Sequence, residues 1–370
     1  MIQPNPLQKG DRVAIISLSN GMLGESYCAH ELELGMNCLK RFGLEPVLTE
    51  NARSGMQMLW EHPELRAADL KAAFLDDGIS GIICAIGGID TFRTFPYLLE
   101  DAEFCQAVRE HPKFFLGYSD TTNNHLMFYR LGLQTFYGQC FLCDHAELSG
   151  DMLPYSKEQF ESCFMPYRGR IIKPADCWYE ERSDYSPSAI GTKPVKHPEM
   201  HGYELLQGEA VFEGELLGGC IDSLAEMLLS DCGKEYAVLF DSLPFIKPSV
   251  FDEQAAVTRK YRIFPNAAEW RGKILFAETS ETSPTPERLR LYLNTLKSEG
   301  VFNSVSGILV GKPMNENYYE EYKTVWRDAV NDPALPILYN VNFGHAAPRA
   351  ILPYGAKVRV NARTQEIQFL

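Results

Sequence analysis

The sequence predicts an α/β fold with two domains, an N-terminal domain built on a parallel sheet and a mixed, β-rich C-terminal domain. At 370 residues the chain exceeds what one hydrophobic core usually organises, which favours two domains. Over residues 1–150 short apolar segments alternate with helical patterns, as in a parallel sheet covered by helices. Residues 151–212 are rich in proline and charge and lack periodicity, which predicts a linker and surface loops before a C-terminal domain over 213–370.

The strands of the first domain are predicted from their composition. Four short segments are apolar and rich in β-branched or aromatic residues, as strands buried on both faces should be. They are residues 13–19, 45–49, 81–86 and 114–118. Apolar residues then repeat at helical spacing over 28–39, and Gly43 is placed to end that helix in a left-handed conformation. Further helices are expected over 64–75 and 91–109, with Pro96 disturbing the first turns of the second.

The C-terminal domain is predicted to mix helices and strands. Pro286 suits a first helical position after Thr285 as cap, and an apolar stripe continues until Gly300 ends this helix. The other expected elements are a helix over 221–229, a strand over 273–278, a strand over 305–310, a helix over 320–330, and short strands and turns from residue 335.

The composition excludes several classes of function. The formal charge is 35 minus 49, or −14 at pH 7, which would repel a nucleic-acid backbone or an anionic membrane surface. The longest strongly apolar stretches have the length of strands, so no membrane span is expected, and the N-terminal residues lack a signal-peptide pattern. Ten cysteines scattered through such a chain favour reduced thiols. We therefore expect a cytoplasmic protein that binds neither nucleic acid nor membranes.

Two short motifs are interpreted as structural. Cys140 and Cys143 have CxxC spacing, but no second pair follows at zinc-ribbon distance. His197 and His201 lie four residues apart, yet Pro198 argues against a helix interior and the order is not HExxH. The sequence therefore predicts no metal site.

The first motif with a chemical interpretation is FFLGYSDTT, residues 114–122, in which an apolar strand runs through Ser119 into a helix. It is similar to a nucleophile elbow, which lifts the serine hydroxyl above the carboxyl edge of a sheet. The next backbone N–H, that of Asp120, could then face an oxyanion. Thr121 occupies the place of the second glycine of the GxSxG pattern, so a helix-capping serine stands as the alternative interpretation.

A second motif, IGGID, ends the neighbouring predicted strand. Gly87 and Gly88 would let the backbone approach a ligand closely, and the carboxyl ends of parallel strands are where α/β proteins bind ligands. One of these two glycines is the candidate second oxyanion donor. The alternative is a plain turn between strand and helix.

A serine nucleophile needs a base and a group that orients the base. His345 is the candidate base because it lies in the loop-like, glycine-flanked segment NFGHAAP. His125 is near Ser119 in sequence but lies about two helical turns beyond it, so it is interpreted as structural. Glu278 ends the predicted strand KILFAE and could fix the histidine tautomer, with Glu281 as a nearby competitor.

Taken together, these motifs resemble the LD-carboxypeptidase family of serine peptidases, which includes the microcin C self-immunity proteases. The resemblance covers most of the chain and rests on segments in one order: GDRVAIISLS, IGGID, KFFLGYSDTTNNH, GELLGGCIDSL, ILFAETSE and NFGH.

The resemblance implies a catalytic triad, an oxyanion hole and an active site between the two domains. The implied triad is Ser119, His345 and Glu278, and the implied hole is formed by the amides of Asp120 and of the Gly87-Gly88 turn. It also implies a homodimer and no cofactor or metal.

The family contains two branches with different substrates. One trims murein tetrapeptides, and the other cleaves peptidyl- or aminoacyl-nucleotide toxins. The segment 146–212, with Trp178 and many aromatic residues, favours the immunity branch, so Trp178 is a candidate substrate-binding residue. Cys220 stands where the family often carries a polar residue, which leaves the substrate open. Two further interpretations are an esterase of the α/β-hydrolase type, disfavoured by Thr121, and a ligand-sequestering protein without turnover.

Overall fold

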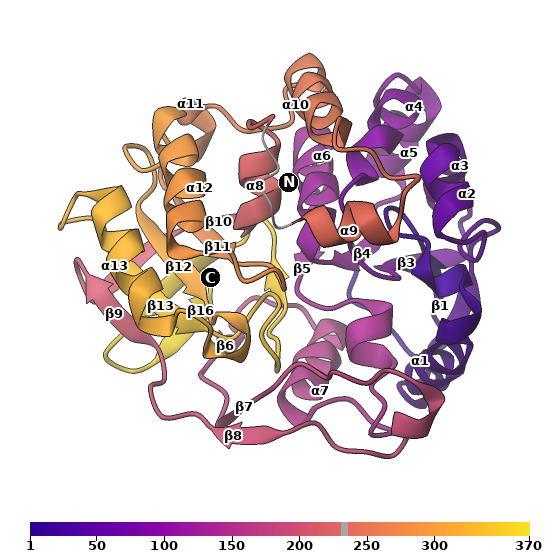
Figure 1. Cartoon of the computed structure of the whole chain (residues 1–370), viewed down its shortest axis with the longest axis horizontal. Helices are drawn as coiled ribbons and strands as arrows, with labels where there is room; N and C mark the ends of the chain where they lie inside the picture. The colour runs from indigo at the N-terminus through magenta and orange to yellow at the C-terminus, as the bar shows by residue number, and fades with distance from the viewer. Residues whose placement is uncertain (231–235) are drawn as a thin grey trace.

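The computed structural model describes residues 1–230 and 236–370. Two sheets lie side by side in Figure 1, one with the indigo and magenta helices of the N-terminal half and one with the orange and yellow elements of the C-terminal half. The predicted fold class, a parallel-sheet α/β region followed by a β-rich α/β region, is confirmed. Among the residues that the structure describes, no helix combines the length and the apolar character that a membrane crossing requires.

The first sheet has six strands in the order β14-β5-β4-β3-β1-β2, and all four strands predicted from composition belong to it. The pairs from β2 to β5 are parallel, whereas β14 pairs antiparallel with β5. The carboxyl ends of β1, β3 and β4 therefore share one edge. The bounds are β1 (Arg12–Ile16), β2 (Glu45–Leu48), β3 (Ile79–Cys84), β4 (Phe114–Gly117), β5 (Phe136–Tyr137) and β14 (Leu352–Pro353).

The helices around this sheet differ from the sequence prediction in two places, one of them the short helix Met56–Glu61, which was not predicted. Gly43 ends the first helix with φ of 83°, as expected. The single helix expected over 91–109 is wrong, because the segment breaks at Asp101, whose side chain caps a new helix by accepting from the backbone N–H of Phe104. The helices are α1 (Ala29–Arg41), α2 (Met56–Glu61), α3 (Pro63–Leu75), α4 (Phe95–Leu99), α5 (Ala102–Glu110) and α6 (Thr122–Leu131).

The segment 151–212, expected to be linker and surface loops, contains regular structure. Two of its strands are the outer strands of the second sheet, and two others form a separate two-stranded ribbon. The pairing partners of the two outer strands lie far away along the chain, so local periodicity gave no sign of them. The elements are α7 (Pro154–Glu161), β6 (Ile171–Ile172), β7 (Cys177–Tyr179), β8 (Lys196–Pro198) and β9 (Glu204–Gln207).

The second sheet has eight strands in the order β6-β16-β15-β10-β11-β12-β13-β9. Its centre, from β10 to β13, is parallel, and its outer pairs are antiparallel. The strands not yet given bounds are β10 (Val211–Cys220), β11 (Lys273–Glu278), β12 (Gly307–Gly311), β13 (Ile337–Val341), β15 (Lys357–Asn361) and β16 (Glu366–Phe369).

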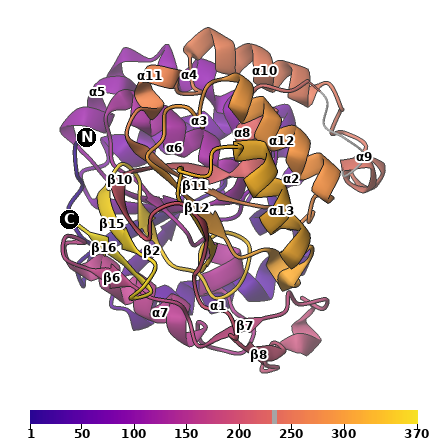
Figure 2. The same cartoon turned by 90° about the vertical axis from the view of Figure 1, so that its left-hand side faces the viewer.

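Helices of the C-terminal half pack on this sheet, and α12 and α13 cover the face turned to the viewer in Figure 2. Thr285 caps α12 by accepting from the backbone N–H of Arg288, as predicted. The helix expected over 221–229 ends earlier, at Glu226. The bounds are α8 (Ile221–Glu226), α9 (Ala237–Ser242), α10 (Val250–Tyr261), α11 (Ala267–Trp270), α12 (Pro286–Ser298) and α13 (Tyr319–Val330).

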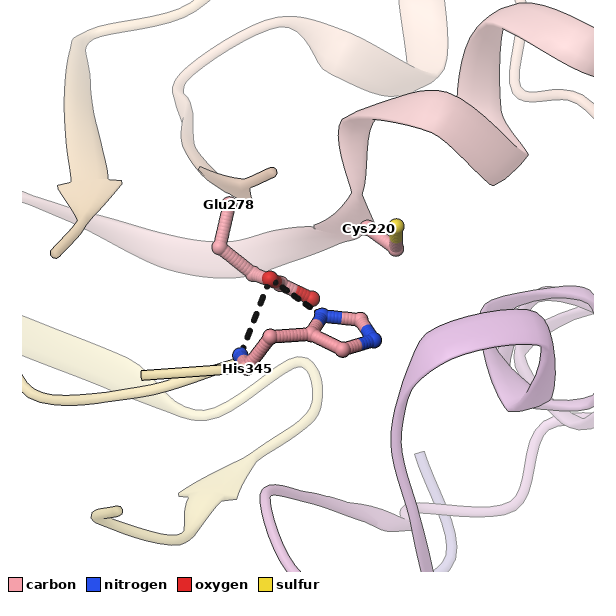
Figure 3. A group of neighbouring side chains, drawn as sticks. All are labelled: Cys220, Glu278 and His345. Atoms are coloured by element: carbon pink, nitrogen blue, oxygen red, sulfur yellow. Dashed lines mark hydrogen bonds and ion pairs between the residues drawn. The ribbon is translucent and has the colours of Figure 1, made fainter. Parts of the chain in front are cut away.

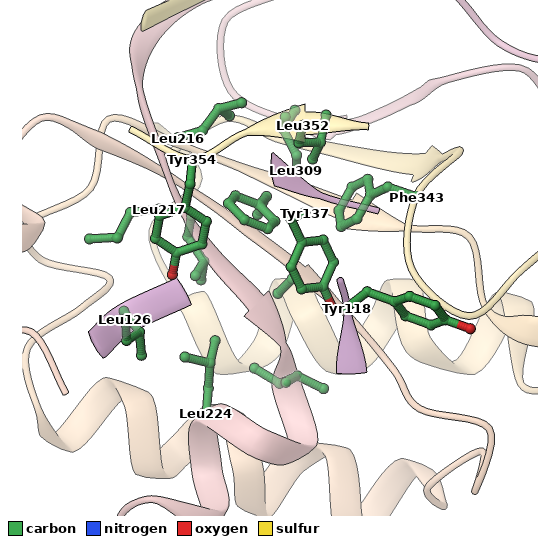
Figure 4. Packing of buried hydrophobic residues seen from close by; sticks show 14 of the residues in the cluster. Tyr118, Leu126, Tyr137, Leu216, Leu217, Leu224, Leu309, Phe343, Leu352 and Tyr354 are labelled. Carbon is green, nitrogen blue, oxygen red and sulfur yellow. The ribbon is translucent and has the colours of Figure 1, made fainter. Parts of the chain in front are cut away.

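A single hydrophobic cluster joins the two sheets. Figure 4 shows Tyr118, Leu126 and Tyr137 of the first half packed among leucines and aromatic rings of the second. The ring of Tyr137 lies 5.3 Å from that of Phe276, between centroids. Because protein interiors are close-packed, this contact fixes the strand ends of one sheet relative to those of the other.

Candidate active site

Ser119 lies directly after β4 in a strained backbone conformation. Its φ is 65°, in the left-handed region that residues with a Cβ rarely adopt. Gly87, at the end of β3, faces it, and a Cβ on this glycine would lie 2.8 Å from the Cβ of Ser119. The strand, the sharp turn at Ser119 and the helix α6 that follows form the predicted elbow.

The structure brings together the three residues that the sequence singled out as a triad. Nε2 of His345 lies 3.1 Å from Oγ of Ser119. On the other side of the ring, Nδ1 lies 2.8 Å from a carboxylate oxygen of Glu278 (Figure 3). Ser119 follows β4, Glu278 ends β11 and His345 follows β13, so the carboxyl edges of both sheets meet at this point.

Glu278 is buried and held on three sides. The hydroxyl of Tyr137 donates to one carboxylate oxygen at 2.5 Å, and the backbone N–H of His345 donates to the other at 3.1 Å. Burial and the charge of Glu278 raise the pKa of Tyr137 well above its usual value, so this hydroxyl stays a donor. Gly311 and Gly344 leave room for the carboxylate, since a Cβ on Gly344 would lie 2.3 Å from its carboxyl carbon.

The loop that carries His345 is fixed by Arg349, which sequence reasoning missed. Its guanidinium donates to the carbonyl oxygens of Gly344 at 2.6 Å and His345 at 2.8 Å. A third bond, 2.9 Å long, reaches the carboxylate of Asp144. Three donors of one rigid fork therefore hold the histidine loop against the helical turn Phe141–His145 that follows β5.

The candidate oxyanion donors lie beside Ser119. The backbone nitrogen of Asp120 is 3.4 Å from the point that a Cβ on Gly87 would occupy, so both backbones border the same small space. Gly88 has φ of 151°, and a Cβ there would lie 2.3 Å from Oγ of Ser19. The tight turn thus requires glycine at both positions.

The carboxylate of Asp120 belongs to a buried network below the elbow. It accepts from the hydroxyl of Ser19 at 2.6 Å and the backbone N–H of Thr91 at 2.9 Å. Burial raises its pKa to about 6. Next to it, Arg66 pairs with Asp90 through two contacts of 2.8 Å. Asp90 stands in the IGGID motif, whereas nothing in the sequence of α3 signals Arg66 as its partner.

Nε2 of His345 has a second partner besides Ser119, the carboxylate of Glu281. A carboxylate oxygen of this residue lies 3.0 Å from Nε2, the nitrogen that also faces Ser119. Burial alone would lower the pKa of His345, but the carboxylates of Glu278 and Glu281 outweigh it and raise the pKa well above its usual value. Both carboxylates therefore favour the protonated form of the ring.

Cys220 lies where it could extend this site into a metal centre. Its Sγ, a carboxylate oxygen of Glu278 and a ring nitrogen of His345 lie within 4.8 Å of one another (Figure 3). Burial and the charge of Glu278 raise the pKa of the Cys220 thiol well above its usual value, which disfavours the thiolate that metals bind. Because both ring nitrogens of His345 already have partners, the arrangement fits proton transfer better than metal binding.

Two other predicted positions lie apart from the triad. The Trp178 ring stacks on His197 at 4.3 Å between centroids, in the ribbon of β7 and β8. The next residue, Tyr179, donates its backbone N–H to the carbonyl of Ala347, so the ribbon borders the histidine loop. His125 is buried within hydrogen-bonding distance of Gly117 O and Thr135 Oγ1, as a structural residue should be.

Two family models match the chain and define its class as a peptidase-type hydrolase. The LD-carboxypeptidase N-terminal domain matches residues 13–138, and the LD-carboxypeptidase C-terminal domain matches residues 213–360. The chain belongs to the LD-carboxypeptidase family, which confirms the resemblance drawn from its motifs.

Individual relatives fall in both expected branches. An MccF-like protein from Streptococcus pneumoniae, solved in complex with AMP, is 44% identical with a TM-score of 0.89, covering 98% of this chain and 99% of that one. A Bacillus subtilis (strain 168) protein named "Probable murein peptide carboxypeptidase" is 26% identical, covering 97% of this chain and 91% of its own. The microcin C7 self-immunity protein MccF of Escherichia coli is 24% identical, covering 82% and 77%.

Proposed function

We propose that this protein is a serine hydrolase that cleaves an amide bond in peptidyl- or aminoacyl-nucleotides. The observation that carries the chemistry is the continuous line of contacts from Ser119 through His345 to Glu278, at 3.1 and 2.8 Å. The nucleotide part of the substrate is supported by the relative at 44% identity that was solved with AMP.

The proposed reaction is acyl transfer in two steps. Nε2 of His345 takes the hydroxyl proton of Ser119, and the oxygen attacks the carbonyl carbon of the scissile amide. The backbone N–H groups of Asp120 and of the Gly87-Gly88 turn stabilise the resulting oxyanion. His345 then donates its proton to the leaving nitrogen, and a water molecule activated by the same histidine releases the acyl group from the serine.

Glu278 orients the histidine in this scheme. Its carboxylate accepts the Nδ1–H bond, which leaves Nε2 free to exchange a proton with the serine once Glu281 withdraws. The hydroxyl of Tyr137 and the backbone N–H of His345 keep the carboxylate in place. We therefore assign Glu278 a positioning and electrostatic role.

A second candidate substrate is a murein tetrapeptide, from which the enzyme would release the terminal D-alanine. The relative from Bacillus subtilis (strain 168), matched over 97% of this chain, favours this alternative. The same triad would serve both reactions, because each one breaks an amide bond.

Product analysis by mass spectrometry tests the proposal. The wild type, Ser119→Ala and the control Ser298→Ala, an exposed serine of α12, are incubated with an aminoacyl sulfamoyl adenosine and with a murein tetrapeptide. We expect release of the sulfamoyl nucleoside by the wild type and the control only. Release of D-alanine instead supports the murein alternative, and failure to cleave either compound rejects both substrates.

We also propose a homodimer, as the family resemblance implies. Light scattering of the purified protein measures the molar mass directly. A mass near twice 41.8 kDa supports the dimer, and a mass near 41.8 kDa rejects it.

A further inference from the structure

A cavity of about 180 Å³ opens beside the candidate oxyanion turn. One wall comes from α2, with Met56 and Trp60, and the opposite wall from α9 and the residues after it. In Figure 2, α9 lies at the right-hand edge of the molecule, beyond α2. Gly88 borders the cavity on the side of Ser119, and Glu281 borders it on the side of His345. None of these lining residues apart from Gly88 and Glu281 has a role in the chemistry proposed above.

The two facing walls of the cavity are apolar and partly aromatic, whereas polar residues line the rest of it: Ser19, Asn20, Asp90, Glu281 and Thr282. The second wall consists of Leu239, Leu243, Phe245 and Ile246. The rings of Trp60 and Phe245 lie 6.4 Å apart, between centroids, so the two walls touch at one end. Apolar pockets that bind small groups are lined in this way, and a dry cavity of about 150 Å³ suffices for benzene. The space therefore suits a side chain of the size of leucine or phenylalanine.

The charges around the cavity disfavour an acidic occupant. Asp90 and Glu281 line it, and no lysine or arginine does so among residues 1–230 and 236–370. Arg66, which lies behind Asp90, uses its guanidinium to pair with that carboxylate at two contacts of 2.8 Å. Arg93 also faces Asp90, at 3.7 Å, so a second carboxylate placed here would lose its hydration next to arginines already engaged with Asp90, which is energetically costly.

The position of the cavity indicates which part of the substrate would occupy it. Gly88 follows Gly87, whose backbone faces Ser119 with a hypothetical Cβ only 2.9 Å from the serine hydroxyl. A carbonyl under attack by Ser119 would place its oxygen in this turn, so a group in the adjacent cavity is attached to the acyl carbon.

We propose that this cavity binds an apolar side chain, aromatic or branched aliphatic, of the residue whose carbonyl Ser119 attacks. The inference rests on the proposed function and specifies its substrate class as nucleotides carrying an apolar acyl residue. Aspartyl and glutamyl residues are discriminated against because the described walls of the cavity offer them no positive charge.

A substrate panel tests the inference. Phenylalanyl, leucyl, alanyl and aspartyl sulfamoyl adenosine are compared by kcat/KM with the wild-type protein. A fully accommodated apolar side chain typically gains tenfold to about two hundredfold over a truncated one. We expect kcat/KM for the phenylalanyl compound to exceed that for the alanyl and aspartyl compounds by at least about tenfold. Equal or better cleavage of the aspartyl compound overturns the inference while leaving the proposed function intact.

Two variants of neighbouring residues in α9 test whether the preference for an apolar acyl residue comes from this cavity. Leu239→Ala enlarges the cavity, whereas Val238→Ala changes a side chain that is 74% exposed and does not line it. We expect Leu239→Ala to reduce the phenylalanyl-to-alanyl ratio of kcat/KM about tenfold and Val238→Ala to leave it unchanged. An unchanged ratio in Leu239→Ala, in a protein with wild-type melting temperature, also overturns the inference.

Binding separates failure of the inference from failure of the proposed function. If no compound of the panel is cleaved, calorimetric titration of Ser119→Ala with the phenylalanyl and aspartyl compounds still reports on the cavity. The inference is supported if the phenylalanyl compound binds more tightly than the aspartyl compound and if adding Leu239→Ala weakens the binding of the phenylalanyl compound. Equal binding of the two compounds, or no effect of the added change, rejects it.

Discussion

Glu281 and His345 form an ion pair at the nitrogen that the proposed reaction uses. The carboxylate oxygen lies 3.0 Å from Nε2, whereas Oγ of Ser119 lies 3.1 Å from the same atom. The Glu281 side chain is 64% exposed, so it can leave the ring, while Glu278 on the opposite nitrogen is buried. One carboxylate therefore contacts Nδ1 of the base, and the other contacts Nε2 and favours its protonated form.

Replacing Glu281 should therefore change the pH dependence of the enzyme. A general base must be neutral, so kcat/KM rises with pH through the pKa of His345 in the free enzyme. Since Glu281 helps to raise that pKa, Glu281→Gln lowers it, and we expect the rising limb to move to lower pH. Steady-state rates between pH 5 and 9 measure the shift. Glu287→Gln, an exposed carboxylate of α12, is the control, and a profile identical to wild type in Glu281→Gln contradicts the assigned contact.

Substitution of Gly344 should reduce turnover as strongly as substitution of a triad residue, although glycine has no side chain. A Cβ at this position would lie 2.2 Å from Cγ and 2.5 Å from an oxygen of Glu278, so alanine must displace the carboxylate or the histidine loop. We expect Gly344→Ala to lower kcat by about a hundredfold or more, since a displacement of 1 Å can cost that much. Turnover of the aminoacyl sulfamoyl adenosine measures the effect.

A matched glycine separates the steric effect from backbone strain. Gly10 has φ of 91°, close to the 89° of Gly344, but a Cβ there would meet no atom within 4 Å. Gly10→Ala carries the same conformational cost without the contact. We expect nearly wild-type turnover from it, and equal losses in the two variants would show that the contact with Glu278 is irrelevant.

The sequence indicated the candidate triad through local signals. Ser119 follows a predicted apolar strand and Glu278 ends another, and the carboxyl ends of parallel strands meet at one edge. His345 was singled out by its glycine-flanked loop, and the strand β13 before it was not predicted individually. The distances of 3.1 and 2.8 Å could come only from the packing of one sheet against the other.

The parts that the sequence did not reveal depend on contacts between distant segments. Arg349 holds the loop of His345 through backbone carbonyls and Asp144, which lies 205 residues earlier. In the sequence, Arg66 on α3 cannot be distinguished from a solvent-exposed arginine, because only the fold places Asp90 beside it. The same holds for the two outer strands of the second sheet, which pair with strands more than a hundred residues away. Periodicity reports which face of an element is buried, not its partner.

Tyr137 should affect turnover more than substrate binding. Its hydroxyl donates to Glu278 and accepts from the backbone N–H of Ser119 at 3.3 Å, so it connects the orienting carboxylate to the elbow. We expect Tyr137→Phe to lower kcat about tenfold, as hydrogen bonds to charged groups contribute about 1.5–3 kcal/mol, with KM within about twofold of wild type. Tyr354→Phe removes another buried hydroxyl, bonded to Gly218 O, and serves as control. A loss confined to KM, or equal kcat losses in both variants, contradicts this positioning role.

Glu226 makes the stability of the protein depend on pH in a direction opposite to that of most carboxylates. Burial, followed by the charge of Asp222, raises its pKa to about 8, and Tyr236 donates to it at 2.6 Å. In the unfolded chain the pKa is about 4.3, so the folded state holds the extra proton between these two values. Stability from this group is present in full below about pH 4 and is lost as pH rises toward 8.

Glu226→Gln removes the titrating group while keeping its shape. We expect the variant to gain about 2–4 kcal/mol relative to the wild type on going from pH 5 to pH 8, because the amide never has to lose a proton in a buried place. Urea denaturation at both pH values measures the difference, and Glu299→Gln, an exposed carboxylate at the end of α12, controls for the change in net charge. If the stability difference between Glu226→Gln and the wild type is the same at both pH values, Glu226 is ionised in the folded protein and its burial must be compensated by a cation.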